Sequence, residues 1–428
     1  MLLILCFAFL SLLSGGLLGW TFSALAGLGN KKHRLSLLLL LPALAAGLGA
    51  VWIYRQTFIS SPIVSQAKDV DVNSPATIYR PASRFQFDFG NIRIPGAYRF
   101  EPRLPEVNTA AALNYIELGV QAWNKKYRCI GCHVTGTYLL IRPMLTSLGP
   151  PSDEVRSFTI EAIRPYLKEG SERLLYFGHR SAQVVYAAAG LASWDQYVTR
   201  TLSPETKQVF ELMLKIQQED GAWNVPSCWP PLQSNRYQLA TVAALALSLA
   251  PGWSDQAEGT AYREKVNQLR RFLKTNHPPH DYARVWLLWA GSRTKDLISQ
   301  KEKLELIEVI WRHQQEDGGW CLRTFARPGE WGDGSRAEKL VSDQDFYFRT
   351  SDGHMTGLAL IALREAGVSS LDRRVQRALR WIENNQRVTG RWFSSSLNTE
   401  RYHMLTYSAT CFALLSQWRC SVLSRPNP

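Results

Sequence analysis

The sequence predicts an all-α protein in which two membrane-spanning helices precede a large domain of paired helices. Three observations carry this prediction. Two segments near the N-terminus contain no charged residue, and each is long enough to cross a bilayer core. From Thr109 onward, apolar residues recur at helical spacing. Three copies of the pattern Gln-x-x-x-Gly-x-Trp mark points where helices end.

The composition is that of a folded protein with a sizeable core. Of the 428 residues, 46% are hydrophobic and 20% are charged, which excludes global disorder. The formal net charge of +13 permits binding to an anionic membrane surface. We find no basic block and no nucleic-acid motif, so we expect no nucleic-acid partner. Seven cysteines are too few for a disulfide scaffold in a chain of this length.

Residues 1–55 are interpreted as a two-span membrane anchor. The apolar stretches 1–29 and 35–54 flank the basic loop Lys31–Arg34. Short basic loops stay in the cytoplasm, so we expect everything after Arg55 on the periplasmic or extracytoplasmic side of the inner (plasma) membrane. A cleavable signal peptide fits residues 1–29 poorly, because no Lys or Arg precedes the apolar stretch.

Residues 56–108 change character and predict an extended, Pro-rich arm that lies on the main domain. Six prolines in this stretch argue against a long helix. The alternating run Arg84–Phe89 is consistent with a short strand.

Residues 109–420 predict about twelve helices in six pairs, followed by a tail at 421–428. The first helices of the pairs carry more charge, and the second helices are rich in small and apolar residues. Helices that are apolar all round are buried, so the second helices are expected to be inner and the first outer, which closes into an α/α barrel. The expected outer helices are 109–124, 154–168, 203–218, 258–274, 300–315 and 371–386. The expected inner helices are 134–148, 180–194, 236–250, 281–292, 352–367 and 403–418.

The repeated pattern is expected to build the joints between helices. Its glycine can adopt the left-handed conformation that ends a helix, and its Gln amide can bond backbone groups at a neighbouring helix end. The tryptophan is expected to stack back on the Gln side chain. We assign the repeats a structural role. Their residues are Gln217, Gly221 and Trp223, then Gln314, Gly318 and Trp320, and finally Gln386, Gly390 and Trp392.

This repeat resembles the QW motif of squalene-hopene cyclases and oxidosqualene cyclases. The resemblance covers roughly residues 109 to 418 and implies the (α/α)6 toroid that these enzymes share with protein prenyltransferases. It also implies a central cavity for an apolar, isoprenoid-like ligand delivered from the membrane lipid. Aromatic residues of the inner helices are the candidates to line that cavity, or to be plain core. They are Trp194, Tyr237, Tyr282, Trp286, Trp289, Tyr347, Phe348, Tyr407 and Phe412.

The acid motif of the cyclases is degraded in this chain. The cyclases protonate their substrate with Asp-x-Asp-Asp-Thr before an inner helix, and the nearest match here is Asp352-Gly353-His354-Met355-Thr356. Protonating an alkene needs a strong, preorganised acid, for which a lone Asp352 is a poor candidate. Asp343 and Asp345 are the alternative acids, although a solvated loop is the favoured explanation, since paired acids in loops are common.

Cys129-Ile130-Gly131-Cys132-His133 carries the strongest chemical signal. It is the attachment pattern of c-type haem, in which two thiols bond the haem vinyl groups and the His binds iron. An Arg-Pro pair, Arg142-Pro143, follows it, as in a bacterial group of squalene-cyclase-like proteins that this chain resembles. The expected extracytoplasmic location is also where c-type haem is attached.

Other interpretations of the motif remain open. The cysteines are also consistent with a disulfide, with half of a zinc site, or with buried thiols. If haem is bound, His133 is the proximal ligand. The candidates for the sixth ligand are Met144, His179, His354 and Met355, each of which packing alone would also explain.

Three functions follow from these patterns. The first is a redox or electron-transfer role, with c-type haem on a cyclase-like scaffold and a redox partner protein. The second is a divergent terpene or squalene cyclase that uses Asp352 or the pair Asp343 and Asp345. The third is a non-catalytic lipid-binding or scaffold protein in which the cysteines form a disulfide.

Overall fold

The computed structural model describes residues 84–176, 179–225, 230–232, 235–253, 262–342, 349–397 and 404–421. The described chain is mostly helical, with one two-stranded sheet, which confirms the predicted all-α class. The two expected spans lie outside the described residues. Among the helices that the structure describes, none combines the length and the apolar character that crossing a membrane requires.

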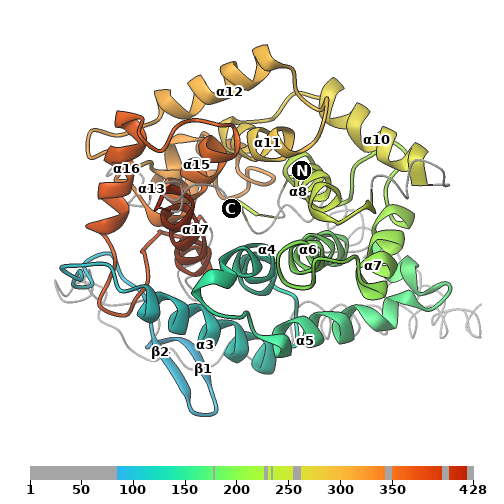
Figure 1. Cartoon of the computed structure of the whole chain (residues 1–428), viewed down its shortest axis with the longest axis horizontal. Coiled ribbons are helices and arrows are strands. Elements are labelled where there is room, and N and C mark those ends of the chain that lie inside the picture. The colour runs from blue at the N-terminus through green and yellow to red at the C-terminus, as the bar shows by residue number, and fades with distance from the viewer. Residues whose placement is uncertain are drawn as a thin grey trace, which may run out of the picture. The chain divides into compact units, whose positions relative to one another are not determined.

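The helices lie in two layers (Figure 1). The outer layer is formed by α3 (Thr109–Tyr127), α5 (Asp153–Ile163), α7 (Pro204–Lys215), α10 (Tyr262–Thr275), α12 (Gln300–Arg312) and α16 (Arg373–Glu383). Several of these helices begin at a side chain that caps the first turn. Asn108, Ser203 and Ser299 each accept a hydrogen bond from a backbone N–H of their own helix, which satisfies one of its unpaired donors.

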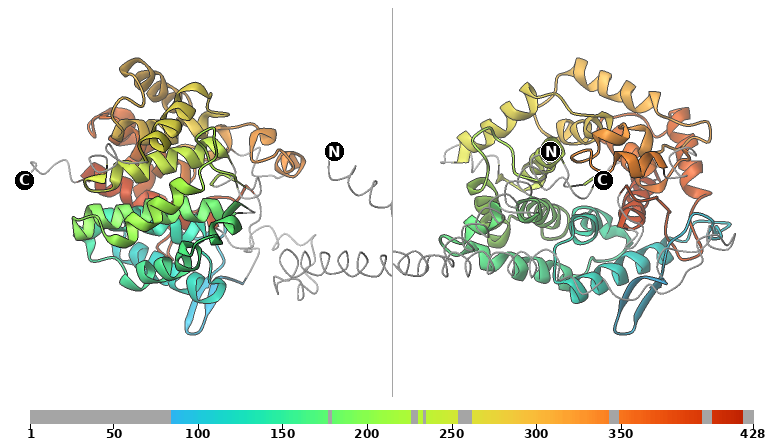
Figure 2. Two further views of the ribbon diagram at one scale, coloured as in Figure 1. Left: turned by 90° about the vertical axis from the view of Figure 1, so that its right-hand side faces the viewer. Right: turned by 180° about the vertical axis from the view of Figure 1, so that it is seen from behind.

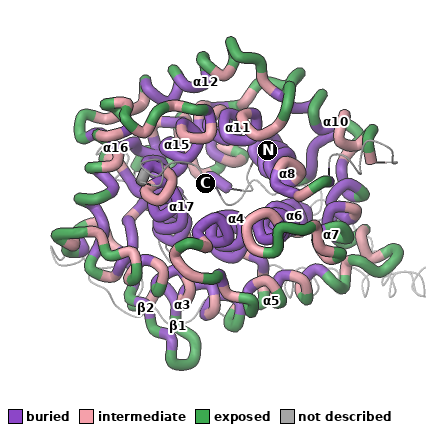
Figure 3. The backbone as a smooth tube through the Cα atoms, in the orientation of Figure 1, coloured by how far each residue is buried: buried purple, intermediate pink, exposed green. Residues whose placement is uncertain are grey.

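The inner layer is formed by α4 (Thr137–Ile141), α6 (Arg180–Trp194), α8 (Arg236–Leu249), α11 (Asp281–Arg293), α15 (Gly353–Glu365) and α17 (Met404–Ser421). Each inner helix contacts the next, and α17 returns to contact α4. Figure 3 shows the inner helices buried on nearly all sides, whereas the outer helices expose one face. This difference follows from the charge pattern that distinguishes the two sets in the sequence.

The first inner helix departs from the expected single helix over 134–148. The segment consists of the π-helical turn η2 (Cys132–Gly136), then α4, and then the 3-10 helix η3 (Arg142–Leu148). Pro143 explains the change after Ile141, because proline has no backbone N–H and its ring collides with the preceding helical turn.

Short helical segments complete the connections between the two layers. They are η4 (Arg164–Leu167), η5 (Ser171–Tyr176), η6 (Asp195–Thr199), η7 (Leu322–Thr324), η8 (Pro328–Glu330) and α13 (Ala337–Ser342). The last three lie between α12 and α15, where the sequence shows no helical periodicity.

The described part of the arm forms a hairpin on the outer layer. The expected strand is present as β1 (Phe85–Phe89), and it pairs antiparallel with β2 (Ile92–Pro95), which the sequence analysis did not predict. Phe87 is buried and packs edge-on against Tyr115 of α3 and Tyr407 of α17. The tip of the hairpin projects from the helices (Figure 2).

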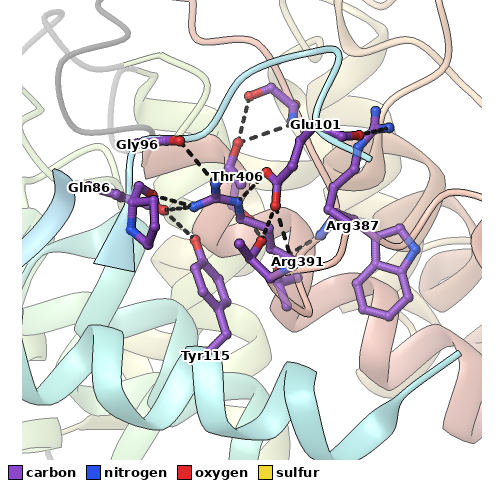
Figure 4. A network of polar contacts seen from close by, with 12 residues as sticks. Gln86, Gly96, Glu101, Tyr115, Arg387, Arg391 and Thr406 are labelled. Atoms are coloured by element: carbon purple, nitrogen blue, oxygen red, sulfur yellow. Dashed lines mark hydrogen bonds and ion pairs between the residues drawn. The ribbon is translucent and has the colours of Figure 1, made fainter. Parts of the chain in front are cut away.

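A buried ion pair ties the arm to the last repeat (Figure 4). Arg391 donates to Glu101 over 2.8 Å, and the two side chains are only 1% and 3% exposed. The remaining guanidinium hydrogens go to the carbonyls of Pro95 and Gly96 and to the side chain of Gln86. Every branch of the Arg391 side chain therefore contacts the arm.

The three repeats form nearly identical joints. Gly221, Gly318 and Gly390 have φ values of +94°, +94° and +86° and follow the ends of α7, α12 and α16. In each copy the tryptophan Nε1 donates to the carbonyl ten residues earlier over 2.8 Å. The three joints therefore share one backbone conformation and one hydrogen-bond pattern.

The Gln amide of each repeat reaches the next outer helix. Gln217, Gln314 and Gln386 each donate to the carbonyl of their own repeat's glycine. Each also donates to a second carbonyl, on Lys265 of α10, on Arg374 of α16 and on Asn108 before α3. The last of these bonds links the final outer helix to the first.

Candidate functional site

The Cys129–His133 motif occupies the joint between α3 and the first inner helix. Arg128 ends α3 in the left-handed conformation, with φ of 47°. The indole Nε1 of Trp123 donates to the carbonyl of Cys129 over 3.0 Å. A Cβ atom on Gly131 would lie only 2.8 Å from the same indole, so glycine is needed there. The joint is thus folded around Trp123.

Both thiols of the motif lie beside one face of α6. Gln183 Nε2 donates to Sγ of the half-buried Cys129 over 2.9 Å. Cys132 is buried. The pKa of the Tyr186 phenol is raised, mainly by burial and to a smaller extent by the nearby Cys132 thiol. Residues three apart on a helix share a face, which places the two thiols on the same side of the joint. Burial raises the pKa of Cys129 to about 11.

None of the cysteines that the structure describes, Cys129, Cys132, Cys321, Cys411 and Cys420, forms a disulfide. Among the described residues, no group of three or more His, Cys, Asp or Glu side chains converges as a metal site. Covalent haem needs no such convergence, because iron takes the imidazole while the thiols bond the porphyrin.

His133 is held as a neutral imidazole. It is 4% exposed, and burial lowers its pKa to about 4. A ring N–H bonds the backbone carbonyl of Pro230, which partly opposes this shift. Metal-binding histidines typically donate one ring N–H to such a partner, which leaves the lone pair of the other nitrogen for the metal. The state of His133 is therefore the one that an iron ligand requires.

His354 lies near His133 in the interior. Burial lowers the pKa of His354 to about 3, and a proton on His133 would oppose protonation of His354 further, so the two imidazoles lie within electrostatic range. Ser408 donates its hydroxyl to the Leu405 carbonyl and lies 2.8 Å from Nδ1 of His354, which makes Nδ1 the protonated nitrogen. Nε2 of His354 then accepts from the Tyr282 hydroxyl over 3.0 Å.

The other candidates for a sixth ligand lie elsewhere or have no link to His133. Met144 is buried, and its sulfur accepts from Arg419 near the end of α17. His179 is exposed at the start of α6. Met355 is fully buried in α15, and within the described ranges no interaction connects it to His133. Of the four candidates, His354 is the one whose pKa responds to His133 in the described part of the chain.

Asp352 caps the N-terminus of α15. One carboxylate oxygen accepts from Met355 N and Ser394 Oγ, and the other accepts from Leu322 N over 2.6 Å. Burial raises its pKa, although the three donors oppose the shift. These bonds join the N-terminus of α15 to the segments that contain Leu322 and Ser394. This structural role accounts for the buried aspartate without a catalytic role. Asp343 and Asp345 lie outside the described residues.

Aromatic rings surround the His354 side chain. Phe412 meets it edge-on with ring centroids 5.0 Å apart, and Trp286 contacts Phe412 and stacks on Trp289. Two of the other expected lining residues point outward instead. Tyr237 donates to a carbonyl of α10 and Tyr407 to a carbonyl of α3, while Tyr347 and Phe348 lie outside the described residues.

Several polar residues of this interior were missed by the sequence analysis. Gln183 and Tyr186 of α6, Gln238 of α8 and Ser408 of α17 all make polar contacts there. Their signal is a single polar side chain on an inner helix that is otherwise apolar. Such residues must find partners when buried, so they mark a polar interior.

Comparison with known proteins does not assign the chain to a family. No protein-family model matches the sequence, and the search of curated proteins finds no match.

Proposed function

We propose that the protein is a redox protein in which an (α/α)6 toroid resembling that of squalene-hopene cyclases carries c-type haem. Cys129 and Cys132 would form the covalent attachment, and His133 would bind the iron. The circuit of inner helices supports the toroid, because each inner helix contacts its neighbours and α17 returns to α4. A two-span anchor at residues 1–55 would hold the domain on the extracytoplasmic side of the inner membrane.

The geometry of the motif is the observation that carries the proposal. Two thiols beside one face of α6 and a neutral, oriented imidazole come from a single five-residue joint. When bound, the haem would accept or donate a single electron. The chain's own contribution is to orient His133 through the Pro230 carbonyl and to hold the thiols at Gln183 and Tyr186. The buried setting would also exclude water from the iron ligand.

The interior next to His133 would also accept an apolar, isoprenoid-like ligand from the membrane lipid. Phe412, Trp286 and Trp289 form a continuous aromatic surface beside His354. Such a surface binds hydrocarbon by burying its area. The electron itself would pass between the haem and a redox partner protein. Asp352 has no role in this proposal beyond capping α15.

Haem content after denaturation tests the proposal. Full-length protein from a host with c-type maturation should stain for haem on a denaturing gel and show the matching gain in intact mass. The Cys129→Ala/Cys132→Ala variant should lose both signals. Cys411→Ala is the matched control, because it removes a buried thiol outside the motif and should retain the haem. Wild-type protein without covalent haem under these conditions would contradict the proposal.

A further inference from the structure

A pocket of about 580 Å³ lies between α8, α10 and the loop after α11, and no residue of the Cys129–His133 joint lines it. Its volume is within the range of about 300–1,000 Å³ typical of small-molecule sites. One side is apolar and is formed by Ala244, Leu247, Trp253, Val266, Leu269 and Leu297. This apolar surface suits a hydrocarbon chain and has no role in the function proposed above.

The polar lining of the pocket carries four cations beside the uncharged Ser248, Asn267 and Thr294. Arg263, Arg270, Arg293 and Lys295 line it, and the described lining contains no Asp or Glu. Arg293 pairs with Glu365 over 3.0 Å. No ion pair within the described ranges involves the other three cations.

Helix dipoles do not cancel this charge. The C-terminal ends of α8 and α11 lie at the pocket, and each brings a partial charge of about −0.5. The positive charges of Arg263, Arg270 and Lys295, which pair with no described carboxylate, outweigh these two partial charges. The pocket therefore has a positive potential that favours an anionic ligand.

Buried donors at the pocket have no acceptor within the described part of the chain. They are Nε1 of Trp253, Nε of Arg293 and Oγ1 of Thr294. Trp253 is only 3% exposed. A buried donor without an acceptor loses its hydration and gains nothing in return, so native proteins rarely leave one. All three atoms are donors in the wall of the pocket, so they add to its positive potential.

We propose that this pocket binds an amphipathic anion, with an acidic head on a single hydrocarbon chain. The head, a carboxylate or a phosphate, would lie against the cations and the buried donors, and the chain would lie on the apolar side. Charge and donors alone would suit inorganic phosphate, and the apolar side alone would suit a neutral lipid. Only the amphipathic anion uses both. The inference does not depend on haem.

Calorimetric titration of the full-length protein in an amphipathic polymer tests the proposal. The probes are decanoate, decyl phosphate, decanol and inorganic phosphate. We expect decanoate or decyl phosphate to bind about tenfold or more tightly than decanol and inorganic phosphate. A preference for decyl phosphate would indicate a phospholipid-derived ligand, and a preference for decanoate would indicate a fatty acid.

Two variants locate the binding. Arg270→Glu/Lys295→Glu should weaken binding of the preferred probe about tenfold or more, because it reverses two charges of the pocket. Leu247→Trp should weaken it by filling the apolar side, with circular dichroism confirming the fold. Lys301→Glu, on the exposed face of α12, is the matched control and should bind as wild type does. Decanol or inorganic phosphate binding as tightly as the anions, or unchanged binding in both pocket variants, would overturn the proposal.

Discussion

The joint between α3 and α4 and the three Gln-x-x-x-Gly-x-Trp joints connect outer to inner helices in different ways. In the repeats, a left-handed glycine ends the helix and a Gln amide bonds the next outer helix. At the α3–α4 joint, Arg128 takes the left-handed position, and Trp123 lies before the turn instead of after it. The Gln, Gly and Trp of the repeats serve the joint itself, whereas this joint carries a half-buried thiol, a buried thiol and a buried imidazole.

The connection between α10 and α11 also lacks the repeat. Its turn is His277-Pro278-Pro279-His280, which has two histidines and is stiffened by two prolines. In the structure, Nδ1 of His280 accepts from Ala283 N and caps α11. A joint without the repeat is therefore not by itself a chemical site. What distinguishes the α3–α4 joint is that its unusual side chains face the interior and do not cap a helix.

The largest expected effect is at the third repeat, where Arg391 adds a buried ion pair to the usual joint. Arg391→Met leaves the Glu101 carboxylate buried without its partner, which should cost about 4 kcal/mol of unfolding free energy. Denaturant unfolding measures it. Lys301→Met removes an exposed pair at 3.9 Å and should cost less than about 0.5 kcal/mol. Equal losses in the two variants would show that the arm is not held by this pair.

The glycine of a repeat should be nearly as sensitive. Gly221→Ala would place Cβ 2.2 Å from the Gln268 carbonyl oxygen at a φ of +94°, so both strain and collision apply. We expect a loss of about 3 kcal/mol in thermal unfolding. Gly367→Ala has a φ of +88° and no atom within 4 Å, so strain alone should cost about 1 kcal/mol. If both variants lose the same unfolding free energy, the close approach of Gly221 to α10 does not constrain the joint.

The α10–α11 joint should make stability depend on pH. Burial lowers the pKa of His280 from 6.5 to about 4, so the unfolded chain binds this proton more readily than the folded chain. Stability present above pH 6.5 is then lost as the pH falls toward 4, by about 2 kcal/mol between pH 8 and pH 5. His280→Asn keeps a capping side chain but does not titrate. Its stability should fall by about 2 kcal/mol less than that of wild type over this range, and parallel pH profiles would contradict the assignment.

The smallest effect is expected at the N-terminus of α15. Asp352→Asn keeps an acceptor for Met355 N but turns an amide N–H₂ toward Leu322 N, which should cost about 1 kcal/mol. Asp372→Asn at the exposed cap of α16 is the control and should be close to neutral. Denaturant midpoints of the two variants give the comparison. A neutral Asp352→Asn would remove the structural explanation of this buried carboxylate.

The order of the outer and inner helices could be predicted from the sequence, because burial on one face or on all faces gives a characteristic pattern of apolar residues. It also located the repeated joints, since three copies share the same spacing. It did not reveal the break at Pro143, where the expected helix over 134–148 changes type. It also did not reveal β2 or the segments between α12 and α15, because short elements are stabilised by contacts with distant parts of the chain.

Only the part of the candidate site that consists of neighbouring residues could be predicted from the sequence. Cys129, Cys132 and His133 are adjacent, so their pattern was visible in the sequence. The nearness of His133 to His354 depends on how α15 packs, and so does the hydrogen bond between Tyr282 and His354. Asp352 was considered as an acid because of its position before an inner helix. The same position makes it a helix cap, which sequence spacing alone does not distinguish from a catalytic group.

The contact of α17 with α3 and α4 determines the order in which this protein can fold. Tyr407 of α17 bonds the Ile116 carbonyl of α3, and the hairpin docks on the joint that precedes α17. Until α17 has been synthesised, the first inner helix keeps an apolar face without a partner. Contacts between such distant segments form slowly, and intermediates that lack them expose apolar surface and aggregate readily. We therefore expect the nascent chain to need a chaperone. We also expect a protein without α17 to aggregate, because its first inner helix exposes apolar surface.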